Sequence, residues 1–548
     1  MPPDASYVFK HALVRETAYH SLLRGKRQQL HARIAEVLEE RFPATVEAEP
    51  ELLAHHCTAA GLSEKAVMYR YRAGQRALAR SALAEAVAQL HQGLEALAGL
   101  PDCSERRRRE MDLQVALGGA LVAAKGYGAP ETGRAFARAR ELCREEGDVQ
   151  PLFPVMNGQV LFHTMRAELH TADAIAAEML GLAQRQGDLA LLIPAYRAMC
   201  LTSLQLGRFA TARDHAEKVL ALYEPARHRA LTSSYTFDQR VVALGFLDSA
   251  LFALGYPDQA RLRGQEQLAE AQELAHPSTL AQALHYACIF SWLPHLSPFH
   301  VPEHGRSPNE NTDPWIHPSR PPPTSSAAQR AIHPRYPGIY HAPGDFEMFR
   351  QLAEALVAVA AEHGLSHFLA HGRVARGWAL IEQGQADEGI TEMRRALAAF
   401  QVSGERLQLA HVSGLLAAAC ISAGRHSEAL SWTAEARDWA GQDGNPRFKA
   451  EHHRRDGQAL LGLPQPDQGA AEACFRRAIA VAQEQGARMW ELRAATSLGQ
   501  LWRNQGRHAE AYNLLAPVYG WFTEGFDTLD LIEAKALLDE TRRMSGFG

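Results

Sequence analysis

Length, composition and charge make this 548-residue chain an ordinary globular protein and exclude several special classes. Apolar residues make up 46% and charged residues 22%, strong helix formers are abundant and β-branched runs are scarce, which predicts an all-α fold. The formal net charge of −5 gives no basic field for nonspecific nucleic-acid binding. Seven scattered cysteines without a CxxC pair favour a reducing, cytoplasmic environment and indicate neither a disulfide framework nor a zinc site.

The N-terminal segment, residues 1–45, differs from the rest of the chain. It begins without the charged-then-apolar pattern of a signal peptide, and the longest apolar run of the chain, around residues 113–124, is too short to span a bilayer. Apolar residues recur mostly at three- and four-residue spacing and predict two amphipathic helices separated near Gly25: Phe9, Leu13, Tyr19, Leu22 and Leu23, then Leu30, Ile34, Val37 and Leu38.

From residue 46 to 293, helical stretches follow one another with short Gly or Pro breaks. A signature of Gly, four residues and Ala recurs along the whole chain, at 207–212, 255–260, 424–429 and 506–511, with Gly389 replacing the alanine at 384–389. The start positions 384 and 424 are 40 residues apart, and 424 and 506 are 82 apart, or two steps of about 41. Such a period predicts a solenoid in which each helix pair packs against its neighbours.

Residues 294–344 break this pattern. They hold 12 of the 28 prolines and show no helical period, so we expect an irregular, disordered insert. Without these 51 residues the distance from Gly255 to Gly384 falls to 78, two periods of 39. A true insert and a reading-frame artefact both fit this arithmetic, and resequencing the coding DNA would separate them. Residues 345–548 then form a second array that ends in a cap around Trp521 to Asp527.

Two stretches carry a resemblance to a family. Residues 7–13, with Glu16 to Tyr19 and Leu30-His31, resemble the helical segment that closes the ATPase module of bacterial STAND or AAA-type regulators, some of which carry a class III adenylate/guanylate cyclase domain. Residues 471–475, 491–495 and 517–527 resemble the C-terminal end of the tetratricopeptide arrays in the same proteins. The resemblance implies a right-handed superhelical solenoid of tetratricopeptide-like helix pairs.

The catalytic parts of that family are not recognisable in the sequence. Gly25-Lys26-Arg27 lacks the upstream glycine and the following hydroxyl residue of a phosphate loop, and no paired-aspartate cyclase site is present. GxSxG, HExxH and strand-linked GxGxxG motifs are also missing. We therefore expect no catalytic residue, cofactor or metal site, and a chain that corresponds to the sensor end of such a regulator.

Several residue groups favour a structural interpretation over a functional one. His11 and His31 lie near a predicted helix face, and without a phosphate loop a nucleotide-sensing role is the less favoured one. The pairs His55-His56 and His452-His453 point to different sides of a helix and have no second cluster at zinc spacing. The run of arginines at 106–109 is flanked by glutamates and is typical of a solvated helix face.

Aromatic residues inside the array are mostly expected to fill the space between helix pairs, but a minority can line a concave, partner-binding surface. We assign Trp378, Trp490 and Arg493 to such a partner groove. An Arg493→Ala variant should then lose partner binding without a lower melting temperature.

The leading functional hypothesis is a noncatalytic sensor and scaffold region that binds a protein or peptide, with an ATPase or nucleotide-cyclase module as a candidate partner. A truncated product of a cyclase or ATP-binding regulator is the alternative. A STAND-type transcriptional regulator fragment is the third. Neither nucleic acid nor a membrane is expected as a partner of this chain.

Overall fold

The structure, a computed structural model, describes residues 17, 19–80, 82–147, 150–288, 346–440 and 446–545. Within these residues the secondary structure is helical and contains no strand, which confirms the predicted all-α class. The resembling stretch 7–13, His11 and the predicted disordered insert 294–344 lie outside the described residues. The domain boundaries predicted at 45, 293 and 344 stay predictions. The helices themselves group into two compact units, Met1–Ala124 with Pro130–Val155, and Lys125–Ala129 with Met156–Gly548.

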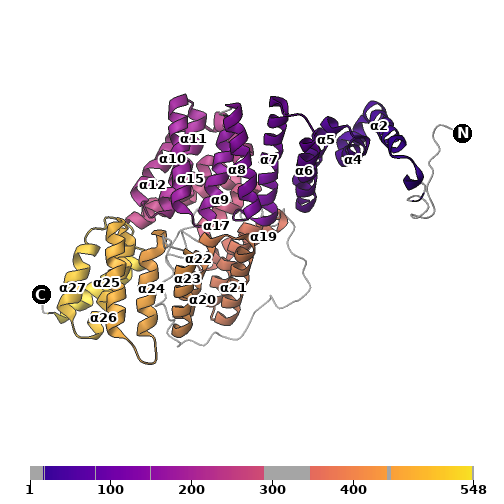
Figure 1. Cartoon of the computed structure of the whole chain (residues 1–548). Helices are drawn as coiled ribbons and strands as arrows, with labels where there is room; N and C mark the ends of the chain where they lie inside the picture. The colour runs from indigo at the N-terminus through magenta and orange to yellow at the C-terminus, as the bar shows by residue number, and fades with distance from the viewer. Residues whose placement is uncertain are drawn as a thin grey trace. The chain divides into compact units, whose positions relative to one another are not determined.

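Unit 1 is a row of helices in which α4 packs against α5 and α5 against α6 (Figure 1). Its core is formed by small and branched apolar residues such as Ala86, Leu90, Leu113 and Leu117. The helices are α2 (Arg24–Arg41), α3 (Pro43–Ala48), α4 (Pro50–Ala60), α5 (Ser63–Ala79), α6 (Leu83–Ala98), α7 (Ser104–Lys125) and α8 (Pro130–Glu146).

Unit 2 contains the longer series of helices, in which neighbours in sequence also pack together in space, as α24 to α27 do in Figure 1. The first half comprises α9 (Leu152–Met165), whose first turn still belongs to unit 1, α10 (Leu169–Gln186), α11 (Leu189–Gln205), α12 (Phe209–Leu222), α13 (Pro225–His228), η1 (Arg229–Leu231), α14 (Thr232–Tyr235), α15 (Gln239–Leu254), α16 (Pro257–Leu274) and α17 (Pro277–Tyr286). The second half comprises α19 (Phe346–Glu362), α20 (Ser366–Glu382), α21 (Ala386–Ser403), α22 (Arg406–Ser422), α23 (His426–Ala440), η4 (Pro446–Phe448), α24 (Lys449–Leu461), α25 (Gln468–Glu484), α26 (Arg488–Asn504), α27 (His508–Tyr519) and α28 (Leu529–Met544).

The recurring glycine signature marks the turn inside five of the helix pairs. All five glycines, at 207, 255, 384, 424 and 506, have φ between +71° and +93°, the left-handed region that a residue without Cβ adopts at little cost. The alanines that close the signature are buried, as at Ala212 and Ala429. In the copy at 384–389, Gly389 replaces this alanine because a Cβ there would lie 2.3 Å from the carbonyl oxygen of Gly377. The signature thus encodes a left-handed helix end followed by a close helix contact.

The helices of unit 2 form two layers. Alternate helices pack against each other as well as against their sequence neighbours, and we call this set the inner layer: α11, α15, α17, α20, α22, α24, α26 and α28. The inner layer also contacts itself across the unit, since α15 packs against α26. In addition, α11 packs against η4, the short helix that precedes α24. The interior of the solenoid is therefore occupied by the chain's own side chains at these contacts.

The sequence of the inner helices reflects this double coverage. Every residue of α15 except Arg240 is buried, and so are the residues 407–420 of α22. The contact between the halves is partly aromatic, with the rings of Phe252 and Trp490 5.8 Å apart. It is also polar, because the backbone N–H of Asp258 donates to Glu524 Oε1 at 3.0 Å. A helix that is covered on all sides needs apolar residues around its whole circumference.

Candidate functional site

Polar side chains gather on the inner layer of unit 2, where most neighbours are apolar. Buried polar residues cost free energy unless they are hydrogen-bonded or paired, so each of them needs a physical account. They form three groups: an ionic network on α24, α26 and α28, a histidine group on α17 and α20, and a pair of arginines on α11 and η4.

Arg493 of α26 lies in the ionic network. Its guanidinium donates to both carboxylate oxygens of Asp530 of α28, at 2.8 and 2.7 Å, and lies 3.6 Å from Glu451 of α24. Glu451 in turn accepts two hydrogen bonds from Arg454 at 2.8 Å. Two arginines and two carboxylates therefore neutralise each other. Burial acts to raise the pKa of Glu451, but the arginine charges and hydrogen bonds outweigh it and hold the pKa well below its ordinary value.

The residues assigned to a partner groove lie inside this interior. Trp490 and Trp378 are 5% and 3% exposed, and the side chain of Arg493 is 9% exposed. The Arg493 guanidinium covers the rings of Trp490 and Phe252 at 5.2 and 5.6 Å. These positions favour a packing role, and the groove assignment stays a prediction. The aromatic and charge pattern of α26 was visible in the sequence, but its burial depends on α15, which is more than 200 residues away.

The histidine group joins α17 to α20. The rings of His285 and His371 stack 3.8 Å apart, and His367 lies 4.8 Å from His371. His367 Nδ1 is 2.7 Å from Glu405, which also accepts the backbone N–H of Tyr127 at 3.2 Å. The i, i+4 spacing of His367 and His371, which places both on one face of a helix, is the sequence signal for this group. No group of three or more ligating side chains in the described ranges could hold a metal ion.

Burial keeps the interior histidines uncharged. Desolvation, followed by neighbouring histidines or arginines, lowers the pKa of His285, His371 and His411 well below 6.5. For His452 the pKa falls to about 3, again through burial first and then the charges of Arg455 and Arg437. At neutral pH these imidazoles are therefore uncharged packing groups.

Two buried arginines, one from each half of unit 2, share the same neighbouring groups. Arg197 of α11 and Arg447 of η4 are both 3% exposed, and Tyr286 and Cys200 act electrostatically on each of them. Arg447 hydrogen-bonds Tyr286 and covers the ring of Phe448, which stacks on His411 at 4.7 Å. Arg197 is the single charged residue of α11, and a lone arginine in an otherwise apolar stretch is a sequence signal for a buried cation.

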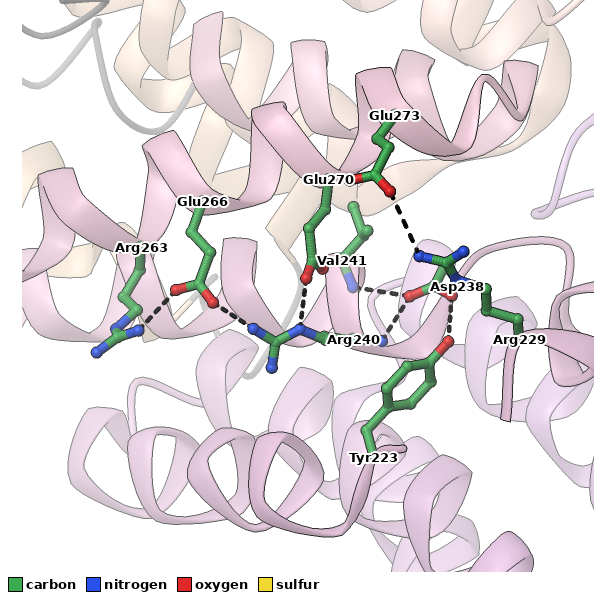
Figure 2. A network of polar contacts seen from close by, with 9 residues as sticks. All are labelled: Tyr223, Arg229, Asp238, Arg240, Val241, Arg263, Glu266, Glu270 and Glu273. Carbon is green, nitrogen blue, oxygen red and sulfur yellow. Dashed lines mark hydrogen bonds and ion pairs between the residues drawn. The ribbon is translucent and has the colours of Figure 1, made fainter. Parts of the chain in front are cut away.

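A further polar network lies near the surface, between α12, α15 and α16 (Figure 2). Buried Asp238 caps α15: its Oδ1 accepts the backbone N–H groups of Arg240 and Val241, and its Oδ2 accepts the hydroxyl of Tyr223 at 2.5 Å. Arg240, the single unburied residue of α15, points toward α16 and pairs with Glu266 and, at 2.7 Å, with Glu270. This network ties three helices together.

The predicted histidine pairs have different surroundings in the two units. In unit 1, His31 of α2 meets His55 and His56 of α4, and His31 Nδ1 lies 2.8 Å from His56 Nδ1. Nothing in the sequence spacing links α2 to α4, so this contact between His31 and the pair was not predicted. In unit 2, His452 is buried whereas His453 is partly exposed.

Fold and interior together define a helical-repeat protein: consecutive, tetratricopeptide-like helix pairs with a polar group of residues enclosed by the inner layer. None of the helices described here is long and apolar enough to cross a membrane. No family model matches the chain. It is 22% identical over 505 residues to an uncharacterized protein of Rhizobium meliloti (strain 1021), a match that covers 91% of this chain and 44% of that protein. The chain thus spans less than half the length of this relative.

Solved structures with similarity to this chain have about 10% identical residues. They include the Rap protein complexed with Competence and Sporulation Factor (77% of this chain and 99% of that chain, 10% identity, TM-score 0.47). The match to the apo form of RapI covers 88% of this chain and 99% of that chain, with 10% identity and a TM-score of 0.27. The match to yeast Tom70 covers 88% of this chain and 97% of that chain, with 10% identity and a TM-score of 0.36. At these TM-scores the fold class rests on the helix pairs of this chain itself.

Proposed function

We propose that this chain is a noncatalytic interaction and scaffold region of a bacterial signalling regulator, which binds a protein partner and controls an ATPase or cyclase module. The observation that carries the proposal is the continuous series of helix pairs, because arrays of this kind present extended surfaces that bind other chains. Because the sequence has no recognisable phosphate loop, any such module would lie outside this chain. A cytoplasmic location belongs to the same proposal.

An exposed apolar face on α2 supports a partner at the N-terminal end. α2 buries His31 and Ala35, yet the neighbouring Leu30 and Ile34 are 43% and 41% exposed. Leu23 just before the helix and Phe42 at its end are exposed as well. Large apolar side chains grouped on one helix are typical of an interaction surface. This is the segment that resembles the end of a STAND ATPase module, and we propose that the rest of such a module covers it.

The length of the Rhizobium meliloti relative agrees with this proposal. More than half of that protein lies outside the match, which leaves room for further domains beside the repeat region. A chain encoded on its own would then meet the module as a separate partner, whereas in a longer protein the two would be covalently linked. The alternative of a truncated regulator therefore shares the same contact surface, and the coding DNA upstream of Met1 distinguishes it. A helix-turn-helix module there would instead favour the transcriptional regulator.

A capture experiment tests the proposal. The tagged full chain is incubated with cell extract with and without ATP, and bound proteins are identified by mass spectrometry. We expect a protein with a phosphate-loop ATPase or class III cyclase module, and at least about tenfold less of it with Leu30→Glu/Ile34→Glu. Leu262→Glu is the control, since Leu262 is a leucine on α16 of unit 2 that is even more exposed, at 60%. ATP hydrolysis by the purified chain would contradict the proposal, and so would an amount of captured partner that the α2 substitutions leave unchanged.

A further inference from the structure

Arg197 is a buried cation with few partners. Its guanidinium is on the inner helix α11 and is 3% exposed. Its Nη2 donates to the side-chain oxygen of Asn157, while its Nε has no hydrogen-bond partner. A guanidinium removed from water is stable only when hydrogen bonds and a counter-charge replace its hydration. Within the described residues the structure supplies one such hydrogen bond.

The groups that act most strongly on Arg197 are phenols and a thiol. They are Tyr235, Cys200, Tyr127 and Tyr286, in that order. Burial raises the pKa of all three tyrosines, so their hydroxyls stay protonated and can donate hydrogen bonds. Burial likewise raises the pKa of Cys200, so the thiol supplies no negative charge at neutral pH. None of these four groups therefore compensates the charge of Arg197.

Arg447 of η4 brings a second buried cation to the same neighbours. It hydrogen-bonds Tyr286 and is influenced by Asp248, which is itself buried. In the described part of the chain, Asp248 is the carboxylate whose charge acts on Arg447. The described groups that act on Arg197 include no carboxylate. The surroundings of Arg197 thus combine an uncompensated positive charge with neutral hydrogen-bond donors, the combination that binds an oxyanion.

We propose that Arg197 anchors an internal site for a small oxyanion, a phosphate or a carboxylate, between α11 and η4. The guanidinium offers Nε and Nη in a fork that matches two oxygens of either group. α11 belongs to the first half of unit 2 and η4 to the second, and the two pack together. Binding therefore stabilises the closed contact between the halves. This inference does not rest on the proposed function.

The test is isothermal titration calorimetry of the full chain with sodium phosphate and, separately, sodium acetate, at constant ionic strength. We expect saturable binding of at least one of the two, and the anion that binds identifies the source of the oxygens. Arg197→Met removes the fork and should weaken binding at least about tenfold, the expected loss for a charge-assisted hydrogen bond. Arg208→Met is the control, because Arg208 is an exposed arginine of the same half that pairs with Asp173 at 2.9 Å.

Absence of binding by both anions would overturn the site, as would unchanged affinity in Arg197→Met. Arg197→Lys keeps the charge but lacks the fork, so it preserves folding if the methionine variant does not fold. We expect its affinity to fall as well, and an unchanged value would also overturn the assignment. Capture of a protein partner through α2 of unit 1 is measured separately from anion binding. The proposed function and the anion site can therefore fail independently of each other.

Discussion

The two ionic networks of unit 2 use the same residue types in different surroundings. Around Arg240, the side chains are 22% exposed for the arginine and 30% and 31% for Glu266 and Glu270. Around Arg493, the values are 9% for the arginine, 3% for Glu451 and 12% for Asp530. Water screens the first network and is largely excluded from the second.

This difference decides what each network contributes. Exposed ion pairs gain little because both partners are well hydrated without each other. In a buried network, removing one partner leaves a charge without either water or a counter-ion. The interior of unit 2 is therefore expected to respond strongly to small chemical changes, whereas the surface between α15 and α16 is expected to tolerate them.

Acidification should produce the largest effect, through the neutral interior histidines. The pKa values of His285, His371, His411 and His452 are lowered in the folded chain, whereas unfolded histidines titrate near 6.5. Below pH 6.5 the unfolded state binds protons that the folded state does not, so the free energy of unfolding decreases as the pH is lowered. Four groups together contribute a loss on the order of 5 kcal/mol between pH 7.5 and 5.5. Urea unfolding at several pH values measures it.

A histidine variant shows whether the interior is the source. His371→Phe keeps a ring between His285 and Phe400, both of which contact it, and removes one titrating group. The free energy of unfolding of this variant should depend less steeply on pH, because about one proton fewer is taken up on unfolding in acid. A stability that stays constant from pH 7.5 to 5.5 in the parent chain would show that these histidines are solvated in solution.

Arg493→Ala should have the next largest effect. Asp530 and Glu451 would lose a buried partner, and Trp490 and Phe252 would lose the guanidinium that covers them. Breaking one partner of a buried pair costs about 3–5 kcal/mol. The expected result is a clearly lower melting temperature, the opposite of the outcome expected if Arg493 lined an open groove. Thermal unfolding followed by circular dichroism measures it.

A double variant sharpens the comparison. In Arg493→Met/Asp530→Leu both charges are gone, so much of the loss should be recovered. If Arg493→Ala instead keeps its melting temperature and loses partner capture, the groove assignment of Trp378, Trp490 and Arg493 is restored.

Local features of the fold could be predicted from the sequence because they act over short distances. The turns at Gly207 and Gly424 need a left-handed backbone, and the buried Ala212 and Ala429 need a close helix contact, so both requirements appear as residue types at fixed spacing. The period of these positions then predicts the series of helix pairs.

The interior of unit 2 could not be predicted in the same way. Whether Trp490 faces solvent or Phe252 depends on the contact of α26 with α15, and small changes in each helix pair accumulate over the repeats between them. The same holds for His285 and His371, which stack although 86 positions separate them in the sequence. Spacing within one helix carries no information on such a contact.

Asp238→Ala should give an intermediate effect, because Asp238 is buried but belongs to the network of Figure 2. The substitution removes the N-cap of α15 and leaves the hydroxyl of Tyr223 without its acceptor. A lost cap and a lost buried hydrogen bond together cost about 2–3 kcal/mol. Asp467→Ala is the matched control, since exposed Asp467 caps α25 through Ala470 alone, and about 1 kcal/mol is expected there. Equal losses in the two variants, measured by urea unfolding, would mean that burial of the cap adds nothing.

Glu270→Ala should give the smallest effect and sets the surface end of the comparison. Glu270 accepts from Arg240 at 2.7 Å, but both side chains reach water and Glu266 remains as a second partner for the same arginine. Ion pairs whose partners both reach water contribute about 0.2–1 kcal/mol, and added salt reduces that further. Urea unfolding at low and high ionic strength measures both parts. A loss above about 2 kcal/mol would place Arg240 with Arg493 among the residues that the fold depends on, because only a desolvated pair carries that much free energy.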